Sequence, residues 1–171
     1  MKLLFPSLLL NCILIGIVVW GVMTGNFPHQ NSVQKPVENI SSPVQTVGIN
    51  KTWNLLSTSS HITFLDAQKT ERIISGNKRY TATKNKSFFI LNILLSNTGT
   101  DTEEIAGTDL PTVHSGSTVL DPYFTLSKLT LDQGSVVNRS LVYVVDNAQK
   151  IFSVVVQPFS APQQILTITF K

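Results

Sequence analysis

A run of basic residues offers the clearest binding chemistry in the sequence. No acidic residue lies between Arg72 and Lys86, while lysines and arginines recur along this polar stretch. Cations gathered on hairpin tips attract anionic lipid headgroups or cell-wall polymers. Alternatively, lysine and arginine keep an exposed edge strand from pairing with other chains. The residues that we predict to form this basic edge and to bind are Lys78, Arg79, Lys84 and Lys86.

Acidic residues crowd a second stretch, at positions 101–109. A loop rich in carboxylates can hold calcium, which takes about six to eight oxygen ligands. The acids here lack the alternate spacing of a calcium-binding loop. The sequence therefore favours a solvated acidic loop, and we predict no metal site. The residues concerned are Asp101, Glu103, Glu104 and Asp109.

The three histidines offer no catalytic or metal-binding spacing. His29, His61 and His114 are far apart, and no HxH, HxxxH or HExxH pattern occurs. The sequence also lacks a Gly-x-Ser-x-Gly elbow for a nucleophilic serine and a glycine-rich phosphate loop. We therefore predict that the protein is not an enzyme and that it uses no cofactor.

Composition argues against nucleic acid as a partner. The formal net charge is +3, from 13 lysines and arginines against 10 acids, whereas nucleic-acid binding calls for a strongly basic face. Tyr80 is the only aromatic residue inside the basic run, so stacking on bases has little support. The single cysteine, Cys12, lies in an N-terminal apolar run. The rest of the chain has no disulfide and depends on packing for its stability.

The N-terminal apolar run is long enough to cross a membrane. Residues 3–23 contain no charge, and about twenty apolar residues span a bilayer as a helix. A cleaved signal peptide, with its shorter apolar region, is one alternative. A lipoprotein signal ending at Cys12 is another, although the apolar run continues beyond that cysteine. Lys2 precedes the run, which favours a single-pass anchor with the C-terminal part outside the membrane.

Two composition changes divide the rest of the chain. Residues 24–46 carry Pro28, Pro36 and Pro43 among polar residues without an apolar period, which indicates an extended, disordered linker. From residue 47 to residue 171, strand-like runs alternate with turn signals every 8–12 residues or so, as in β-sandwiches. We therefore predict an anchor at 1–23, a linker at 24–46 and one all-β sandwich domain at 47–171.

The stretch Ser87–Asn97 predicts the central strand of that domain. Phe89, Leu91, Ile93 and Leu95 recur with a period of two, which is typical of a strand with one buried face. Phe88, Ile90 and Leu94 make the other face apolar as well, so we expect both faces to be covered.

Further apolar alternation predicts the other strands and their inward residues. We expect a hairpin or loop around Gly76-Asn77, and a hairpin turn at Asp146-Asn147. We also expect a turn at Asn97-Thr98-Gly99 that uses left-handed backbone angles. The residues predicted to point inward along the main strands are Ile62, Phe64, Leu141, Tyr143, Val145, Phe152, Val154, Val156, Leu166, Ile168 and Phe170. In the irregular stretch 123–131 we also expect Leu126, Leu129 and Leu131 to point inward.

The order of these segments resembles a known domain family. The marks are a strand ending in Asn97-Thr98-Gly99, a Leu131–Gly134 lead into the next strand, and the apolar-aromatic run Leu141-Val142-Tyr143. Over residues 47–171 the chain resembles the telokin-like immunoglobulin-fold domain of unknown function, found on secreted, membrane-anchored or lipid-anchored bacterial proteins. This resemblance implies an immunoglobulin-like antiparallel β-sandwich in the cell envelope. It implies neither catalytic residues nor a ligand.

Two functions remain open at this stage. The first is a non-catalytic module with a binding or structural role, anchored in the cell membrane and facing an envelope polymer or a protein outside the cell. The second is an accessory subunit of a membrane complex, which meets its partner through the helix at residues 3–23. If that segment is cleaved, the domain is secreted instead.

Overall fold

A computed structural model describes residues 38–39, 44–125 and 127–171 of the chain. By its internal contacts the chain divides into two units, residues 1–33 and 34–171. All described residues belong to the second unit. The predicted anchor at residues 3–23 therefore lies outside the described residues, as does most of the predicted linker. No helix within the described ranges is long and apolar enough to span a membrane.

The described residues form an all-β fold with one short 3₁₀ helix. The strands are β1 (Glu38–Asn39), β2 (Gln45–Asn54), β3 (Ser60–Thr70), β4 (Arg72–Ser75), β5 (Lys78–Thr81), β6 (Lys86–Asn97), β7 (Glu103–Ile105), β8 (Thr112–Ser115), β9 (Thr118–Leu120), β10 (Leu129–Leu131), β11 (Val136–Asp146), β12 (Ile151–Val156) and β13 (Gln164–Thr169). The helix η1 covers Gly107–Asp109.

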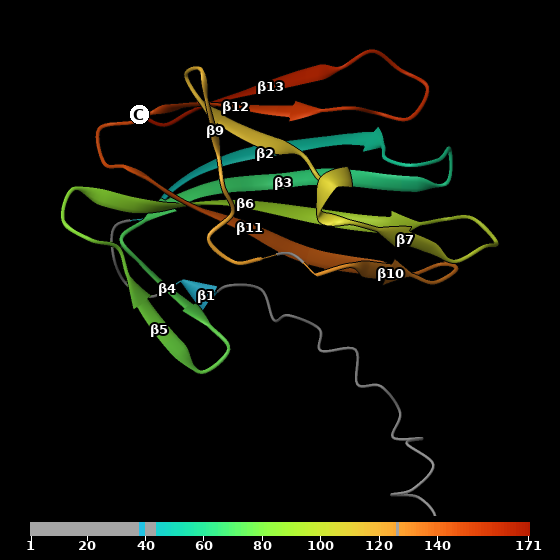
Figure 1. Cartoon of the computed structure of the whole chain (residues 1–171), viewed down its shortest axis with the longest axis horizontal. Helices are drawn as coiled ribbons and strands as arrows, with labels where there is room; N and C mark the ends of the chain where they lie inside the picture. The colour runs from blue at the N-terminus through green and yellow to red at the C-terminus, as the bar shows by residue number, and fades with distance from the viewer. Residues whose placement is uncertain (1–37, 40–43, 126) are drawn as a thin grey trace, which may run out of the picture. The chain divides into compact units, whose positions relative to one another are not determined.

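Strand β6 is central in the larger of two main sheets, as the sequence predicts. This antiparallel sheet has the order β11-β6-β3-β2 (Figure 1). Strand β6 pairs with β11 from Lys86↔Asp146 to Ser96↔Val136, and with β3 along its other edge. Its twelve residues contribute apolar side chains to both faces.

The second main sheet has the order β13-β12-β8-β9 and is also antiparallel (Figure 1). Strand β12 pairs with β13 on one side and with β8 on the other. Side chains alternate along these strands, so that Phe152, Val154 and Val156 are buried while Ile151 is exposed. The fold is consistent with a β-sandwich, in which two sheets bury their facing side chains between them.

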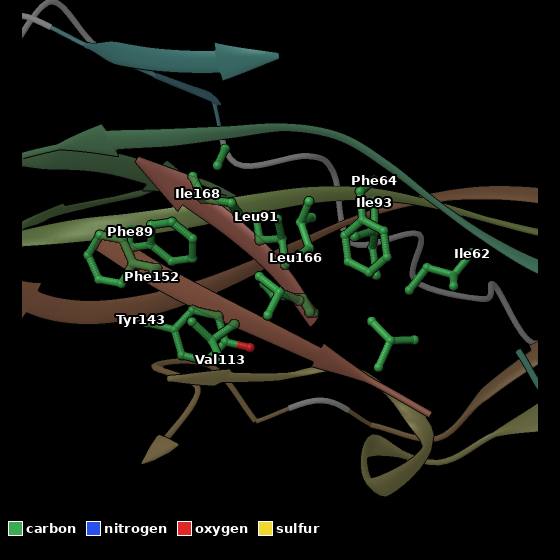
Figure 2. Close-up of a cluster of buried hydrophobic side chains, with 14 of the residues drawn as sticks. Ile62, Phe64, Phe89, Leu91, Ile93, Val113, Tyr143, Phe152, Leu166 and Ile168 are labelled. Atoms are coloured by element: carbon green, nitrogen blue, oxygen red, sulfur yellow. The ribbon is translucent and has the colours of Figure 1, made fainter. Parts of the chain in front are cut away.

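The main hydrophobic core joins side chains of both sheets (Figure 2). Phe89 of β6 stacks on Phe152 of β12, with ring centroids 4.4 Å apart and an interplanar angle of 25°. Phe170 meets both rings edge-on, at 6.0 Å. All the residues predicted to point inward along the main strands are buried, and burying such side chains contributes about 1.5–3 kcal/mol each. Of the three further leucines expected to point inward, Leu131 is buried, Leu129 is half-buried and Leu126 lies outside the described residues.

A smaller sheet covers part of the outer face of the larger sheet. It has the order β1-β4-β5 and contains the predicted hairpin around Gly76-Asn77. Ile73 of β4 packs in a second apolar cluster with Phe88, Ile90 and Val142. The expectation that both faces of β6 are covered is therefore confirmed for Phe88 and Ile90, whereas Leu94 is only half-buried.

The Asp146-Asn147 turn differs from its predicted role. It follows β11, which pairs with β6, and leads to β12, which pairs with β8 and β13. The turn therefore carries the chain from one main sheet to the other and does not close a hairpin. The Asn147 N–H donates to the Asn85 carbonyl oxygen at 2.9 Å, which holds the crossover against the start of β6.

The Asn97-Thr98-Gly99 turn is present, but the predicted left-handed angles are wrong. Neither Asn97 nor Gly99 has a positive φ. The Asn97 side chain holds the turn by donating to the carbonyl oxygens of Asp101 and Leu131, at 2.7 and 3.0 Å. Gly99 is required by space, because a Cβ there would lie 2.8 Å from the Ser59 hydroxyl oxygen.

Strands β1 and β2 reach into the range predicted as linker. Strand β2 starts at Gln45, two positions before the predicted domain boundary, and β1 falls inside the predicted linker range. Backbone pairing explains both. Glu38 and Asn39 pair with Ile74 and Ile73 of β4, and Gln45 pairs with Lys69 of β3.

Candidate functional site

The predicted basic residues lie on and beside the β4–β5 hairpin. Lys78 and Arg79 are exposed on β5, which is the outer strand of its sheet, and Lys84 is exposed in the turn that follows. In the described part of the chain, no carboxylate lies within ion-pair distance of these three side chains. Lys86 differs from them, because its ammonium group contacts the Asp146 carboxylate at 2.6 Å. The predicted basic edge thus holds three unpaired cations and one paired cation.

The hairpin register places Arg72 on the same face as Arg79, whereas Lys78 alternates to the other face. Arg79 pairs with Ile74, and the adjacent outward pair is Arg72 with Thr81. Antiparallel partners point to the same face, so Arg72 and Arg79 share the face that points away from the sandwich. Glu71 precedes Arg72 and is the one acid between residues 71 and 84. We call Arg72, Lys78, Arg79 and Lys84 the basic hairpin.

Aromatic side chains fix the other face of this hairpin. Tyr80 of β5 meets Phe124 edge-on at 5.4 Å and Tyr123 at 6.0 Å. Tyr123 in turn contacts Phe88 of β6 at 5.3 Å and is 45% exposed. The basic hairpin is therefore held on the sandwich by a packed aromatic cluster, with one tyrosine at the surface.

A buried lysine was not predicted from the sequence. Lys69 is only 7% exposed, and its ammonium group donates to the carbonyl oxygens of Asn147 and Gln149, both at 2.7 Å. Burial lowers the pKa of Lys69, with a further contribution from the charge of Lys150. Both lysines line a cavity of about 170 Å³ that Glu71 also borders. Nothing in the local sequence distinguishes this lysine from an exposed one, because its partners are backbone atoms some 80 positions away.

A hydrogen-bonded polar network crosses the uncovered part of the larger sheet. The Asn92 amide donates to the Asp66 carboxylate at 2.7 Å, and the Ser140 hydroxyl donates to Asn92 at the same distance. These residues border a cavity of about 310 Å³ together with Arg139, whose pKa is lowered by burial. The network links β3, β6 and β11, and its groups satisfy one another.

The acidic residues of the predicted loop contact different partners. Glu103 accepts a hydrogen bond from the Ser57 hydroxyl, Glu104 pairs with Lys128 at 2.5 Å, and the Asp109 carboxylate accepts from the Ala106 N–H at 2.7 Å. Among the described residues, no three histidine, cysteine or acidic side chains are grouped so as to hold a metal ion.

Two of the histidines have polar neighbours of their own. His61 Nδ1 lies 3.0 Å from the Asn54 side-chain oxygen, and its Nε2 lies 3.3 Å from the Thr98 hydroxyl. His114 lies 3.3 Å from the Thr112 hydroxyl on its own strand. His29 lies outside the described residues.

Comparison with known proteins identifies no family for this chain. No protein-family model matches the sequence, and no curated protein matches it. A conserved hypothetical protein of Bacillus anthracis is similar in structure, with a TM-score of 0.54 and 11% identity over 77% of this chain and 100% of that one. An uncharacterized β-sandwich protein of Clostridium difficile matches with a TM-score of 0.49 and 14% sequence identity. That match covers 71% of this chain and 91% of the other chain. At such identities a likeness concerns the fold alone.

A third similar structure belongs to a longer protein. It is described as a candidate lipoprotein of Bacillus subtilis, with a TM-score of 0.47 and 18% identity. The match covers 67% of this chain but only 37% of the Bacillus subtilis chain. The sheet arrangement itself is consistent with a β-sandwich, and these comparisons supply no activity.

Proposed function

We propose that the protein is a non-catalytic, extracytoplasmic β-sandwich module, anchored by residues 3–23, whose basic hairpin binds the anionic headgroups of the membrane. The observation that carries this proposal is the group of exposed cations Arg72, Lys78, Arg79 and Lys84, with no ion-pair partner among the described residues. Each lysine or arginine near an anionic membrane contributes about 1 kcal/mol of attraction.

Chain connectivity favours a membrane over a distant partner. Strand β1 begins at Glu38 and pairs with β4. Strand β4 in turn pairs with β5, the strand that carries Lys78 and Arg79. Only 14 residues separate Met23, the end of the proposed anchor, from Glu38. Fully extended, a segment of that length reaches about 50 Å at most. The partly exposed Tyr123 beside it is a residue type that favours membrane–water interfaces.

The finer fold assignment is part of the same proposal. We infer that the sandwich is of the telokin-like immunoglobulin type suggested by the sequence resemblance. The support is the presence of two antiparallel four-stranded sheets, between which the chain crosses after β11.

Vesicle binding tests the electrostatic part of this proposal. The full chain is held in nanodiscs of zwitterionic lipid and mixed with phosphatidylglycerol vesicles at low salt, and the bound fraction is measured by flotation. Arg79→Gln should weaken binding about fivefold, the equivalent of about 1 kcal/mol. Lys51→Gln is the matched control, because Lys51 is an exposed cation on β2, in a different sheet.

Salt and lipid composition decide the outcome. Binding should fall steeply as salt rises and should vanish on phosphatidylcholine vesicles, because exposed charges are screened within about 10 Å at 0.1 M salt. Equal losses for Arg79→Gln and Lys51→Gln would point to net charge alone and would refute a binding role for the hairpin.

A further inference from the structure

The outer edge of β13 has backbone groups that no described strand uses. β13 is the end strand of its sheet, and β12 is its one neighbour among the described strands. The Phe170 N–H donates to the Lys150 carbonyl at 2.9 Å, which identifies the pair 150/170 as a hydrogen-bonded one. Hydrogen-bonded pairs alternate along an antiparallel ladder. The N–H and C=O groups of Ile165, Thr167 and Thr169 therefore point away from β12.

The other outer strands of the two main sheets are protected. The register of β2 shifts between Gly48 and Lys51, so a bulge and a cation interrupt that edge. The Tyr123 N–H donates to the Val142 carbonyl at 2.6 Å, which occupies part of the β11 edge. Strand β9 is three residues long, and Pro122 follows soon after its end.

Strand β13 has none of these protective features. Its sequence, QILTIT, contains no charge, no proline and no bulge, and Ile165 is 64% exposed. An uncharged, regular, apolar edge is a template for strand addition. β13 also lies at the end of its sheet, so an added strand would extend that sheet (Figure 1).

We propose that β13 pairs with β13 of a second copy of this chain, antiparallel and centred on Thr167, so that the two sheets become one continuous sheet. In this register Thr167 lies opposite its own counterpart, and Ile165 lies opposite Thr169 of the other copy. The backbone N–H and C=O groups of all three residues point away from β12, so every pair can exchange two hydrogen bonds. On the inner face, Leu166 meets Ile168 and extends the apolar contact.

The same register keeps like charges apart where the strand ends. Lys171 lies opposite Gln163, so the two lysines do not face each other. In a twofold contact of this kind the β13 edge of each copy is occupied by the other. The assembly is then closed at two copies, which limits growth into fibres.

Cross-linking tests the register directly. In a Cys12→Ser background, Thr167→Cys places two thiols on the twofold axis, where the Cα atoms would lie about 5.5 Å apart, within disulfide range. Thr169→Cys is the matched control on the same strand and face. Its two copies would be about 14 Å apart, too far for a disulfide.

The full chain in detergent is oxidised at several protein concentrations, and the covalent dimer is quantified. Thr167→Cys should cross-link at least tenfold faster than Thr169→Cys. Equal cross-linking of both variants would indicate association through another part of the chain and would overturn the proposal. Absence of cross-linking in both would overturn it as well, because the edge would then be free or covered by something else.

A charge variant supplies an independent measurement. Thr167→Lys places two ammonium groups opposite each other on the twofold axis, so the dimer measured by sedimentation equilibrium should weaken at least tenfold. Thr112→Lys, at an exposed position on β8 of the same sheet, is the control and should dimerise normally. A monomeric wild-type chain, or equal dimerisation of both lysine variants, would contradict pairing through β13.

Discussion

Phe152 provides the sharpest test of how the two sheets are held together. It comes from β12 and is fully buried, while its stacking partner Phe89 comes from β6 of the opposite sheet. Phe170 packs edge-on against both rings at 6.0 Å. The three rings therefore connect the sheets across the middle of the core, and truncating one of them removes contacts on both sides.

The cost of Phe152→Ala follows from this packing. Truncating a buried phenylalanine costs about 3–5 kcal/mol, because the side chain's burial is lost and a cavity remains. The total stability of a domain is about 5–15 kcal/mol, so the variant should lose a large fraction of it. Phe152→Leu keeps an apolar side chain but loses two aromatic contacts, which are worth about 0.5–1.5 kcal/mol each.

Urea unfolding of the full chain in a mild detergent, followed by tryptophan fluorescence in a Trp20→Phe background that leaves Trp53 as the reporter, measures these losses. Ile151→Ala is the matched control, because Ile151 neighbours Phe152 on the same strand but is 54% exposed on the other face. That control should change the free energy of unfolding by less than about 0.5 kcal/mol. If Phe152→Ala costs no more than Ile151→Ala, the two sheets do not pack through this aromatic group.

Three further predictions concern buried polar groups, each measured by urea unfolding. Burial raises the pKa of Tyr143, so the folded chain keeps the phenol proton above about pH 10, where the unfolded chain releases it. Stability should therefore fall as pH rises through this range, and Tyr143→Phe should remove that part of the loss. Lys69→Met should cost about 1–3 kcal/mol, because the carbonyl oxygens of Asn147 and Gln149 lose charge-assisted hydrogen bonds. Asn97→Ala should cost about 2–4 kcal/mol, because it removes two donated hydrogen bonds and one accepted from the Gly99 N–H at 2.9 Å.

Local sequence pattern predicted the strands well where one face is buried. The alternation from Phe89 to Leu95 identified the inner face of β6, and the apolar residues Phe88 and Ile90 correctly indicated a second covered face. The pattern is informative here because side chains on a strand point to opposite faces in turn.

Pairing between distant segments could not be predicted in the same way. The turn at Asp146 carries hairpin-type residues, yet β11 and β12 belong to different sheets. Whether β11 and β12 pair with each other depends on which strands occupy the neighbouring edges. The local sequence does not determine this. The same limit applies to Lys69, whose partners lie across the sandwich, and to Lys86, whose cation is engaged by Asp146.

The pairing of β6 with β11 has a consequence for how the chain reaches its native state. Its partners are separated by 40 residues at Ser96↔Val136 and by 60 at Lys86↔Asp146. The intervening chain includes β8 and β9, which belong to the opposite sheet. Neither sheet can therefore be completed from a contiguous piece of sequence. Folding should be a slow, all-or-none event on the millisecond-to-second scale, limited by the search for these distant partners.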